Sequence, residues 1–308
     1  MKIALRICVE TYRQTREGVP RLLEILQRHK VGASFLFSLG PDHTGRAIRH
    51  GFAHESMRNS TSERVLARYG FPTLMYGTAL PAPDIGRRCA QTMKDAKTAG
   101  FETAIQGWNH HAWLQRIVTA NAAWTTAEMQ RAHQRYAEVF DCEALGHGAA
   151  AWQMNIHALR LTQRLGYRWA SDCRGTHPFV PLWNGEPIHC PQLPTTLPTF
   201  DELIGNDGHT ADNVYQQVLK LTAIEQPAGH VFTVHADLYG GTTATALETL
   251  LASWADQAHQ ICSLGTLRDG LDFASLPRHE LVLAAIPGRA GRFLSQGEVF
   301  LSSWKDAA

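Results

Sequence analysis

The sequence predicts an α/β protein whose parallel strands close into a barrel or a barrel-like sheet. Short apolar runs of strand character alternate with amphipathic stretches of helical periodicity along most of the 308 residues. The first strand, helix and second strand fit within fewer than forty residues, which predicts a parallel βαβ unit. About seven such repeats favour a barrel over an open doubly wound sheet. No glycine-rich phosphate-binding motif follows a predicted strand, so nucleotide binding is not indicated.

The first βαβ unit lies at the N-terminus. Residues 2–9 (KIALRICV) have the pattern of a buried strand, and residues 31–39 (VGASFLFSL) that of a second apolar strand. Between them a helix is predicted at 19–30, where Pro20 lies in the first turn and apolar residues recur at helical spacing: Leu22, Leu23, Ile25 and Leu26.

The same alternation continues to about residue 264. The predicted helix and strand pairs are 83–99 with 101–106, 126–140 with 144–150, 156–166 with 167–171, 210–225 with 230–236, and 244–259 with 260–264. We therefore expect one barrel domain over residues 1–270, followed by a tail, 271–308, that wraps the outside of the barrel.

Two segments interrupt this alternation of predicted helices and strands. Residues 41–82 form a long insertion in which arginines alternate with aromatic and aliphatic residues. Such a segment can lie on a membrane surface, or it can form a helical cap over the barrel mouth, and the sequence leaves both open. Residues 187–200 (PIHCPQLPTTLPTF) contain too many prolines for a helix, so an ordered loop or an edge strand is predicted.

The bulk properties exclude several classes of function. The formal net charge of +1 gives no reason to expect a nucleic-acid partner. No apolar run approaches the roughly 20 residues that span a bilayer, and no signal peptide precedes the first strand. The six cysteines are scattered without a CxxC pair, so reduced thiols and a cytoplasmic location are expected.

Polar residues follow the predicted strands where a barrel of βα repeats carries its site. In such a barrel the carboxyl ends of the strands meet at one rim, so residues far apart in sequence converge there. The candidates at this rim are Cys8, Glu10, Gln106, Asn109, His110, His111, Gln153, Asn155, Asp172, Arg174, His235 and Asp237.

Six stretches of the chain, in order and with matching spacing, resemble a known enzyme family. They are LRICVETYRQTREGVPRLLEIL, ASFLFSLGPDHTGR, GWNHHAW, SDCRG, QLPTTLPTFDELIG and FTVHADLYG. Together they resemble the bacterial 4-deoxy-4-formamido-L-arabinose-phosphoundecaprenol deformylases, of the polysaccharide deacetylase (NodB-homology) superfamily. The resemblance implies a distorted (β/α) barrel and a divalent metal of the zinc, manganese or cobalt class. It also implies removal of a formyl group from a lipid-linked aminosugar of lipid A modification, by a protein peripheral to the inner membrane.

The family pattern is altered at several site positions. Its first strand normally ends in Asp-x-Asp, where this chain has Cys8 and Glu10. Its His-x-x-x-His metal pair corresponds here to Gln106 and His110, with an asparagine, Asn109, where an aspartate is usual. Gln153 replaces an arginine that normally pairs with the catalytic carboxylate, and an amide also replaces a carboxylate at position 155. His235 matches the late histidine of the family, its expected general acid.

The resemblance and the alterations together define the candidate site. We expect Glu10, His110 and Gln106 to bind the metal, and His235, Cys8 and Glu10 to take part in catalysis. Substrate contacts are expected from Asp172, Arg174 and Gln153, although the first two could equally form a structural ion pair. A set of one carboxylate, one imidazole and one amide holds zinc weakly, and a Cys8 thiolate is an alternative ligand.

The joint loss of a carboxylate at Cys8 and of its guanidinium partner at Gln153 suggests a neutral pocket. Three hypotheses follow: a metal-dependent deformylase, a catalytically impaired relative that acts as a binding or regulatory protein, and a hydrolase with a thiol nucleophile. The last requires His110 or His235 as a base near Cys8.

Overall fold

The computed structural model describes residues 1–49, 69–237 and 242–300. Its main sheet has seven strands in the order β5-β4-β3-β2-β1-β8, with β9 also paired to β1, and every pairing in it is parallel. The strands are β1 (Lys2–Val9), β2 (Ser34–Ser38), β3 (Glu102–Gly107), β4 (Gly146–His147), β5 (Trp169–Ala170), β8 (His230–His235) and β9 (Gln260–Cys262).

The proline-rich segment closes the gap between the two edge strands of this sheet. The Leu193 backbone N–H donates to the Ala170 carbonyl of β5 at 2.7 Å, and the Thr196 N–H donates to the Val231 carbonyl of β8 at 3.1 Å. A proline lacks the N–H for such bonds, so the residues between the prolines make them. The predicted distorted (β/α) barrel is confirmed, and the segment predicted as a loop or an edge strand completes it.

Helices surround the barrel. They are α1 (Val19–Arg28), α2 (Thr44–Arg49), α5 (Phe71–Met75), α6 (Ile85–Arg88), α7 (Ala90–Thr98), α8 (His110–Arg116), α9 (Ala122–Phe140), α10 (Ile156–Arg164), α11 (Phe200–Leu203), α12 (Val214–Thr222), α13 (Thr242–Asp256) and α14 (Leu264–Asp269). Three further short turns are a π-helix at Gln14–Gly18 and 3₁₀ helices at Ala150–Trp152 and Phe273–Ser275.

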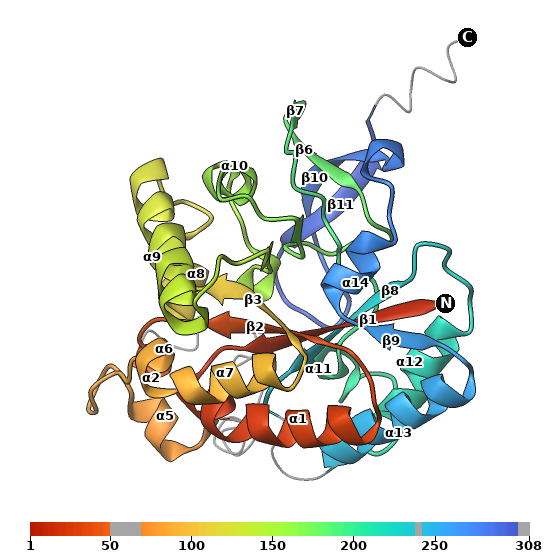
Figure 1. The fold of residues 1–308 in the computed structure, drawn as a ribbon, viewed down its shortest axis with the longest axis horizontal. Coiled ribbons are helices and arrows are strands. Elements are labelled where there is room, and N and C mark those ends of the chain that lie inside the picture. The colour runs from red at the N-terminus through yellow and green to blue at the C-terminus, as the bar shows by residue number, and fades with distance from the viewer. Residues whose placement is uncertain (50–68, 238–241, 301–308) are drawn as a thin grey trace.

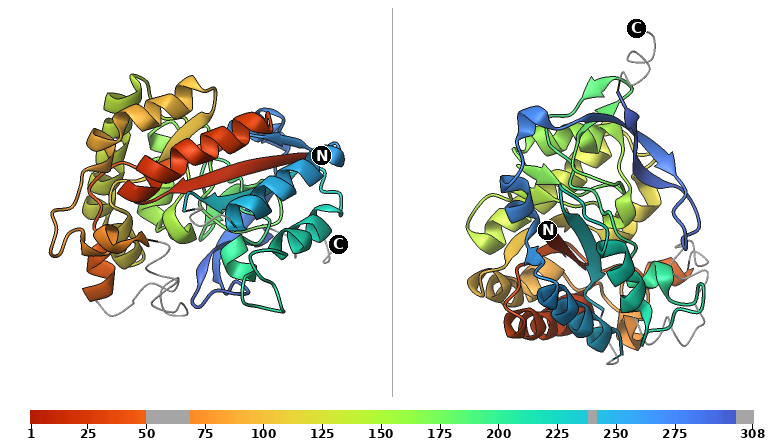
Figure 2. Two further views of the ribbon diagram at one scale, coloured as in Figure 1. Left: turned by 90° about the horizontal axis from the view of Figure 1, so that it is seen from below. Right: turned by 90° about the vertical axis from the view of Figure 1, so that its right-hand side faces the viewer.

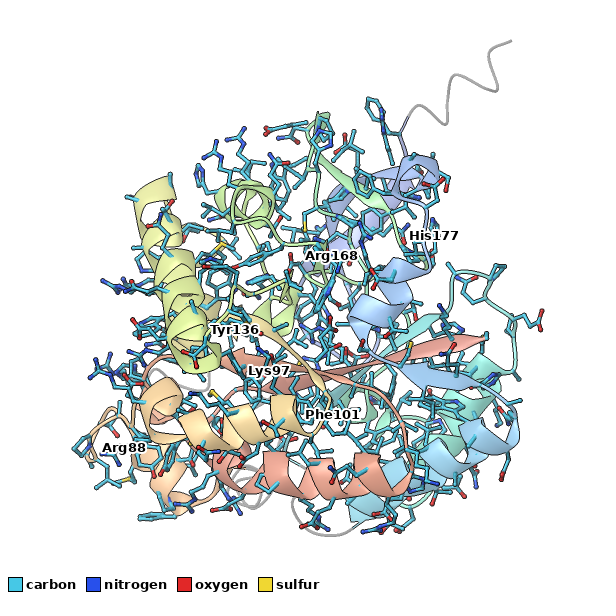
Figure 3. All side chains as sticks on the ribbon, viewed as in Figure 1. Arg88, Lys97, Phe101, Tyr136, Arg168 and His177 are labelled. Carbon is cyan, nitrogen blue, oxygen red and sulfur yellow. The ribbon has the colours of Figure 1, made fainter. Side chains whose placement is uncertain are left out.

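The helices cover the outer face of the strands. Figure 1 shows α1 and α7 below β1 to β3, and Figure 2 shows α1 running alongside β1. Tyr136 illustrates the packing between α9 and β3, since its hydroxyl donates to the Thr103 carbonyl at 3.0 Å (Figure 3).

Strand β1 separates two apolar layers. Ile3, Leu5, Ile7 and Val9 belong to the main hydrophobic core together with residues of the surrounding helices. Ala4 points the other way, because side chains alternate along a strand. It belongs to a smaller cluster that fills the barrel interior, formed by Ala4, Leu36, Ala104, Trp169, Leu193, Val231, Cys262, Leu264 and Leu267. The inward positions that follow along the strand are therefore 6, 8 and 10.

A second sheet of four strands was not predicted from the sequence. Its order is β11-β10-β6-β7, with β6 (Val180–Trp183), β7 (Glu186–Pro187), β10 (Arg278–Ala284) and β11 (Phe293–Val299). Strands from the predicted tail thus pair with a strand that follows β5. Figure 2 shows this sheet at the side of the molecule away from α1 and α13.

Part of the predicted insertion lies outside the described residues. Positions 50–68 include three of its five arginines, so the arrangement predicted for that stretch is not tested. On either side of it, the short helices α2 and α5 contact each other, and α2 also contacts α8.

Candidate active site

Glu10 lies at the centre of the candidate site. Its Oε1 is 3.4 Å from His235 Nδ1 and 3.4 Å from Gln106 Nε2, and its Oε2 is 3.9 Å from His110 Nε2. The Gln14 side chain accepts a hydrogen bond of 2.6 Å from the Glu10 backbone N–H. The structure therefore brings residues from β3, α8 and β8 around a buried carboxylate at the end of β1.

Cys8 lies beside this group. The pairing of β1 with β8 places Cys8 directly opposite His235. Ligand atoms of Cys8, Glu10 and His235 all lie within 4.8 Å of one another. Burial raises the pKa of the Cys8 thiol to about 11, against the opposing effect of the nearby Arg6 guanidinium. The thiol is consequently protonated at neutral pH, which does not favour a role as general base.

Arg6 was not among the predicted site residues, yet it borders the site. It is the inward residue before Cys8 on β1, and it is almost fully buried. Its Nη1 donates to Cys8 Sγ at 2.6 Å, and its Nη2 donates to the Ala149 carbonyl at 2.9 Å. Gly148 leaves room for this side chain, because a Cβ there would lie 3.1 Å from Arg6 Nη2 and 2.1 Å from Leu36. The prediction of a neutral pocket is wrong, since a buried guanidinium faces Cys8.

The donors around Glu10 fit a divalent cation. Carboxylate and imidazole groups are provided by Glu10 and His110. Gln106 Oε1 is buried, and the described part of the chain offers it no hydrogen-bond partner. An amide oxygen with an unused lone pair is a suitable third ligand for ions harder than zinc, such as the manganese class. Donors of the kind that such a metal takes are thus present around Glu10, and the ligand atoms of Glu10, Cys8 and His235 lie within 4.8 Å of one another.

Gln106→His is expected to strengthen the binding of Co²⁺ or Zn²⁺. An imidazole nitrogen is a better ligand for both ions than an amide oxygen, so we expect the Kd to fall by about tenfold or more. Calorimetric titration of the metal-free protein measures this. Gln27→His is the control, because it adds an imidazole at an exposed position of α1. An unchanged Kd in Gln106→His contradicts the assignment of this residue as a ligand.

Gln153 contributes its backbone and side chain in different ways. Its carbonyl accepts a hydrogen bond of 2.9 Å from Trp113 Nε1. Its side-chain Oε1 is buried and has no hydrogen-bond partner among the described residues. A buried acceptor without a partner is costly, so this oxygen is available for a donor on a ligand.

Asp172 and Arg174 do not pair with each other. Asp172 is fully buried, and its Oδ1 accepts hydrogen bonds of 2.7 Å from His147 Nδ1 and from the Ala149 N–H. Arg174 Nη1 instead donates to both carboxylate oxygens of Glu202, at 3.1 and 3.2 Å. These contacts place Asp172 in a buried structural network, whereas Arg174 lies in a separate ion pair.

Two asparagines at the predicted rim serve as helix caps. The Asn109 side chain accepts from the Ala112 N–H at the start of α8, and the Asn155 side chain accepts from the Ala158 N–H at the start of α10. Asn109 Nδ2 also lies 2.7 Å from His43 Nδ1. An amide at these positions therefore has a local structural role, which the comparison with charged family residues did not reveal.

Asp42 is a neighbour of the site that the sequence analysis missed. It follows β2, and its carboxylate accepts hydrogen bonds from the Tyr12 N–H at 2.9 Å and from the Thr44 N–H at 3.0 Å. It thereby ties the loop after β1 to the loop after β2. Its signal was its place just after a strand, in the motif GPDHTG.

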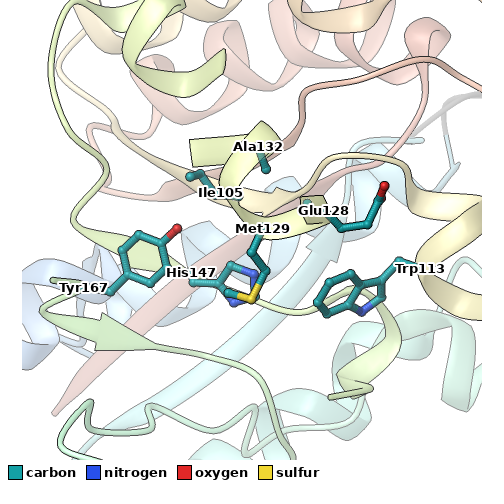
Figure 4. Close-up of a pocket in the computed structure, with 8 residues that line it drawn as sticks. Ile105, Trp113, Glu128, Met129, Ala132, His147 and Tyr167 are labelled. Carbon is teal, nitrogen blue, oxygen red and sulfur yellow. The ribbon is translucent and has the colours of Figure 1, made fainter. Parts of the chain in front are cut away.

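A narrow, mostly apolar pocket lies between α9 and the strands, next to the His147 of the buried network (Figure 4). It is lined by Ile105, Gly107, Trp113, Glu128, Met129, Ala132, His147 and Tyr167. None of the predicted site residues contributes to this lining. The pocket is therefore separate from the polar group around Glu10.

The chain is similar to curated proteins over nearly its whole length. It is 34% identical over 307 residues to a Shewanella sediminis protein named as a 4-deoxy-4-formamido-L-arabinose-phosphoundecaprenol deformylase, covering 99% of this chain and 98% of that protein. The chain belongs to this deformylase family. A Wigglesworthia glossinidia brevipalpis member with the same name is 27% identical over 290 residues, covering 92% of this chain and 99% of that protein. No protein-family model matches the chain.

Solved structures agree with the deformylase-family fold. A structure named as a polysaccharide deacetylase from Mycobacterium smegmatis superposes with a TM-score of 0.60 at 16% identity, covering 92% of this chain and 95% of that one. A CE4 family pseudoenzyme from Bacillus anthracis superposes with a TM-score of 0.51 at 14% identity, covering 91% of this chain and 69% of that one. At these identities the likeness shows a shared fold.

Proposed function

We propose that this protein is an amidohydrolase that removes the formyl group from a 4-formamido-arabinose linked through phosphate to a polyprenol. The proposal rests on membership of the deformylase family together with one structural observation. Glu10 lies between the imidazoles of His110 and His235 at the carboxyl ends of the barrel strands. This is where a barrel of this type carries its chemistry.

Hydrolysis of the formamide adds water to the formyl carbon, breaks the C–N bond and releases formate and an amine. A divalent ion bound by Glu10, His110 and Gln106 would supply Lewis acidity to the formyl oxygen. We assign the proton transfers to His235, which takes a proton from the attacking water and passes it to the leaving nitrogen. Glu10 Oε1 lies 3.4 Å from Nδ1 of this imidazole and places a negative charge beside it. We assign Gln153 Oε1, which is buried without a hydrogen-bond partner among the described residues, to accept from an N–H or O–H of the sugar.

Because the Cys8 thiol is neutral, we propose that the protein catalyses this hydrolysis slowly. In the family pattern a carboxylate at this position acts as a separate base, whereas here one imidazole has to serve both as base and as acid. A catalytically impaired relative with a binding role is the alternative, and Cys8 is the observation that favours it. The two differ in whether any formate is released.

The membrane contact is also a proposal. No helix in the described ranges is long and apolar enough to cross a bilayer. Phe71, at the start of α5 in the insertion, is 67% exposed, and Leu80 in the same insertion is 41% exposed. Exposed apolar side chains beside arginines support a peripheral contact with the inner face of the cytoplasmic membrane, where a lipid-linked substrate is available.

Chelation and two substitutions test the assigned roles. We expect formate release from a short-prenyl analogue of the substrate to stop after treatment with a chelator and to return on addition of Co²⁺. Glu10→Gln and His110→Ala are each expected to lower kcat/KM by about 10³-fold or more, because the first removes the negative charge of the proposed metal-binding carboxylate and the second removes an imidazole ligand. His189→Ala, at an exposed loop histidine, is the matched control and should leave kcat/KM unchanged. Equal rates in His110→Ala and the control would contradict the assignment.

A further inference from the structure

Three arginine side chains gather around one buried tryptophan beside the candidate site. The guanidinium carbons of Arg174, Arg289 and Arg6 lie 4.8, 4.9 and 5.9 Å from the ring centroid of Trp152. Trp152 is fixed in turn by a hydrogen bond of 3.1 Å from its Nε1 to Thr195 Oγ1. Arg6 contacts Cys8, so this cluster adjoins the group around Glu10.

Two of the three guanidinium groups, those of Arg174 and Arg289, share the Glu202 carboxylate as a direct partner. Glu202 Oε1 accepts from Arg174 Nη1 at 3.1 Å and from Arg289 Nε at 2.7 Å, while Oε2 also accepts from the Thr199 N–H at 3.0 Å. Arg6 faces a thiol and a carbonyl instead. The other nearby carboxylates are engaged elsewhere, Asp172 with His147 and Glu10 with the site residues.

Arg174 and Arg289 each have N–H groups that Glu202 does not use and that could donate to a ligand. Glu202 takes only Nη1 of Arg174 and only Nε of Arg289, and no other acceptor is seen for them among the described residues. Both side chains are 14% exposed, so the cluster is reachable from solvent. Burial lowers the pKa of Arg174 despite its pairing with Glu202, and the positive charges of Arg289 and Arg6 lower it further. The cluster therefore carries an excess of positive charge, which favours the binding of an anion.

The loop between β10 and β11 is shaped to place Arg289 here. Gly288 has a φ of +78°, and a Cβ at this position would lie 2.2 Å from the Glu202 carbonyl oxygen. Only glycine allows the loop to approach α11 so closely. The next residue, Arg289, donates its backbone N–H to the Ile286 carbonyl at 3.1 Å. A loop of the second sheet thus places the positively charged side chain of Arg289 at the rim of the barrel.

We propose that Arg174 and Arg289, stacked on Trp152, form a binding site for the phosphate group of the substrate. Guanidinium groups bind phosphate oxygens through paired N–H donors, and stacking on an aromatic ring fixes their orientation. The proposed function supplies the identity of the anion, a phosphate between the sugar and the polyprenol. In this arrangement the phosphate lies on the arginines and the formamide lies near Glu10 and His235.

Binding measurements test this site without any need for turnover. The probes are neryl phosphoryl arabinose, neryl arabinoside without phosphate, and inorganic phosphate, titrated by calorimetry into wild type, Arg289→Gln and Arg292→Gln. Arg292 is the matched control, because it lies on the same loop and its Nε donates to the Leu283 carbonyl. We expect Arg289→Gln to weaken binding of the phosphoryl arabinose by about tenfold or more and to leave the phosphate-free arabinoside unaffected. Arg292→Gln should change neither Kd.

The outcomes separate this site from the proposed function. An unchanged Kd for the phosphoryl arabinose in Arg289→Gln, or an equal loss for the phosphate-free arabinoside, overturns the phosphate site even if formate is released. Conversely, Arg289-dependent binding without formate release supports the site and contradicts the proposed function. Tighter binding of the phosphoryl arabinose than of inorganic phosphate identifies the lipid-linked sugar as the ligand, and equal binding identifies free phosphate. If Arg289→Gln does not fold, Arg289→Lys retains the charge without the paired donors and should show an intermediate loss.

Discussion

Replacing Cys8 by Asp is expected to raise kcat/KM for formate release by about 10²-fold or more. The wild-type thiol is protonated at neutral pH, because burial raises its pKa to about 11. A carboxylate at this position would instead face the guanidinium of Arg6, which now lies 2.6 Å from Sγ. That positive charge favours the ionised form, so the variant would carry a base in addition to His235.

Cys8→Asn is the matched control for this substitution. Asparagine has nearly the shape of aspartate but accepts no proton, so kcat/KM should stay at or below the wild-type value. Formate release is measured for the three proteins at equal metal content. A gain in the asparagine variant, or none in the aspartate variant, contradicts the view that a missing base limits this site.

Asp172→Ala is expected to lower the free energy of unfolding by about 3–5 kcal/mol. The carboxylate is fully buried, and it accepts hydrogen bonds from His147 Nδ1 and from the Ala149 N–H, both at 2.7 Å. Its removal leaves these donors buried without a partner. Urea denaturation followed by circular dichroism measures the loss.

Asp212→Ala, at an exposed loop position, is the comparison for this loss and should change the free energy of unfolding by about 0.5 kcal/mol or less. The pair of variants also decides between the two roles considered for Asp172. A stable Asp172→Ala protein with weakened binding of the arabinoside would show that Asp172 contacts the sugar. A large loss of stability would show that it supports the fold.

The barrel could be predicted from sequence because its signals are local. The strand KIALRICV and the helix after it have unambiguous periodicity, and the structure places them at Lys2–Val9 and Val19–Arg28. The convergence of Glu10, His110 and His235 also followed from strand order alone, since the carboxyl ends of parallel strands meet at one rim.

Other features depend on contacts that no local pattern reveals. Strand β10 pairs with β6, about a hundred residues earlier in the chain, so the second sheet had no local signature. Arg289 reaches the site on a loop of that sheet, and for this reason it was missed. Arg6 was hidden within an apolar run, where a single charged residue did not alter the prediction of a buried strand.

The hydrogen-bond and ion-pair partners of the site residues could not be predicted from the sequence either. Asp172 and Arg174 are two residues apart on one segment, which made a mutual ion pair a reasonable hypothesis. Their side chains point to different surroundings, and each finds another partner: His147 for the aspartate and Glu202 for the arginine. Alternation along an extended backbone does not by itself say which distant group a side chain will meet.

The most direct test of the proposed function is a single measurement of formate release. The purified protein, loaded with Co²⁺, is incubated with neryl phosphoryl 4-formamido-arabinose that carries ¹³C in the formyl group, and the products are followed by NMR. The account predicts a ¹³C formate signal that grows in step with the free 4-amino sugar and is absent when Glu10→Gln replaces the wild type. An unchanged formamide signal after prolonged incubation with Co²⁺, Mn²⁺ or Zn²⁺ would contradict it.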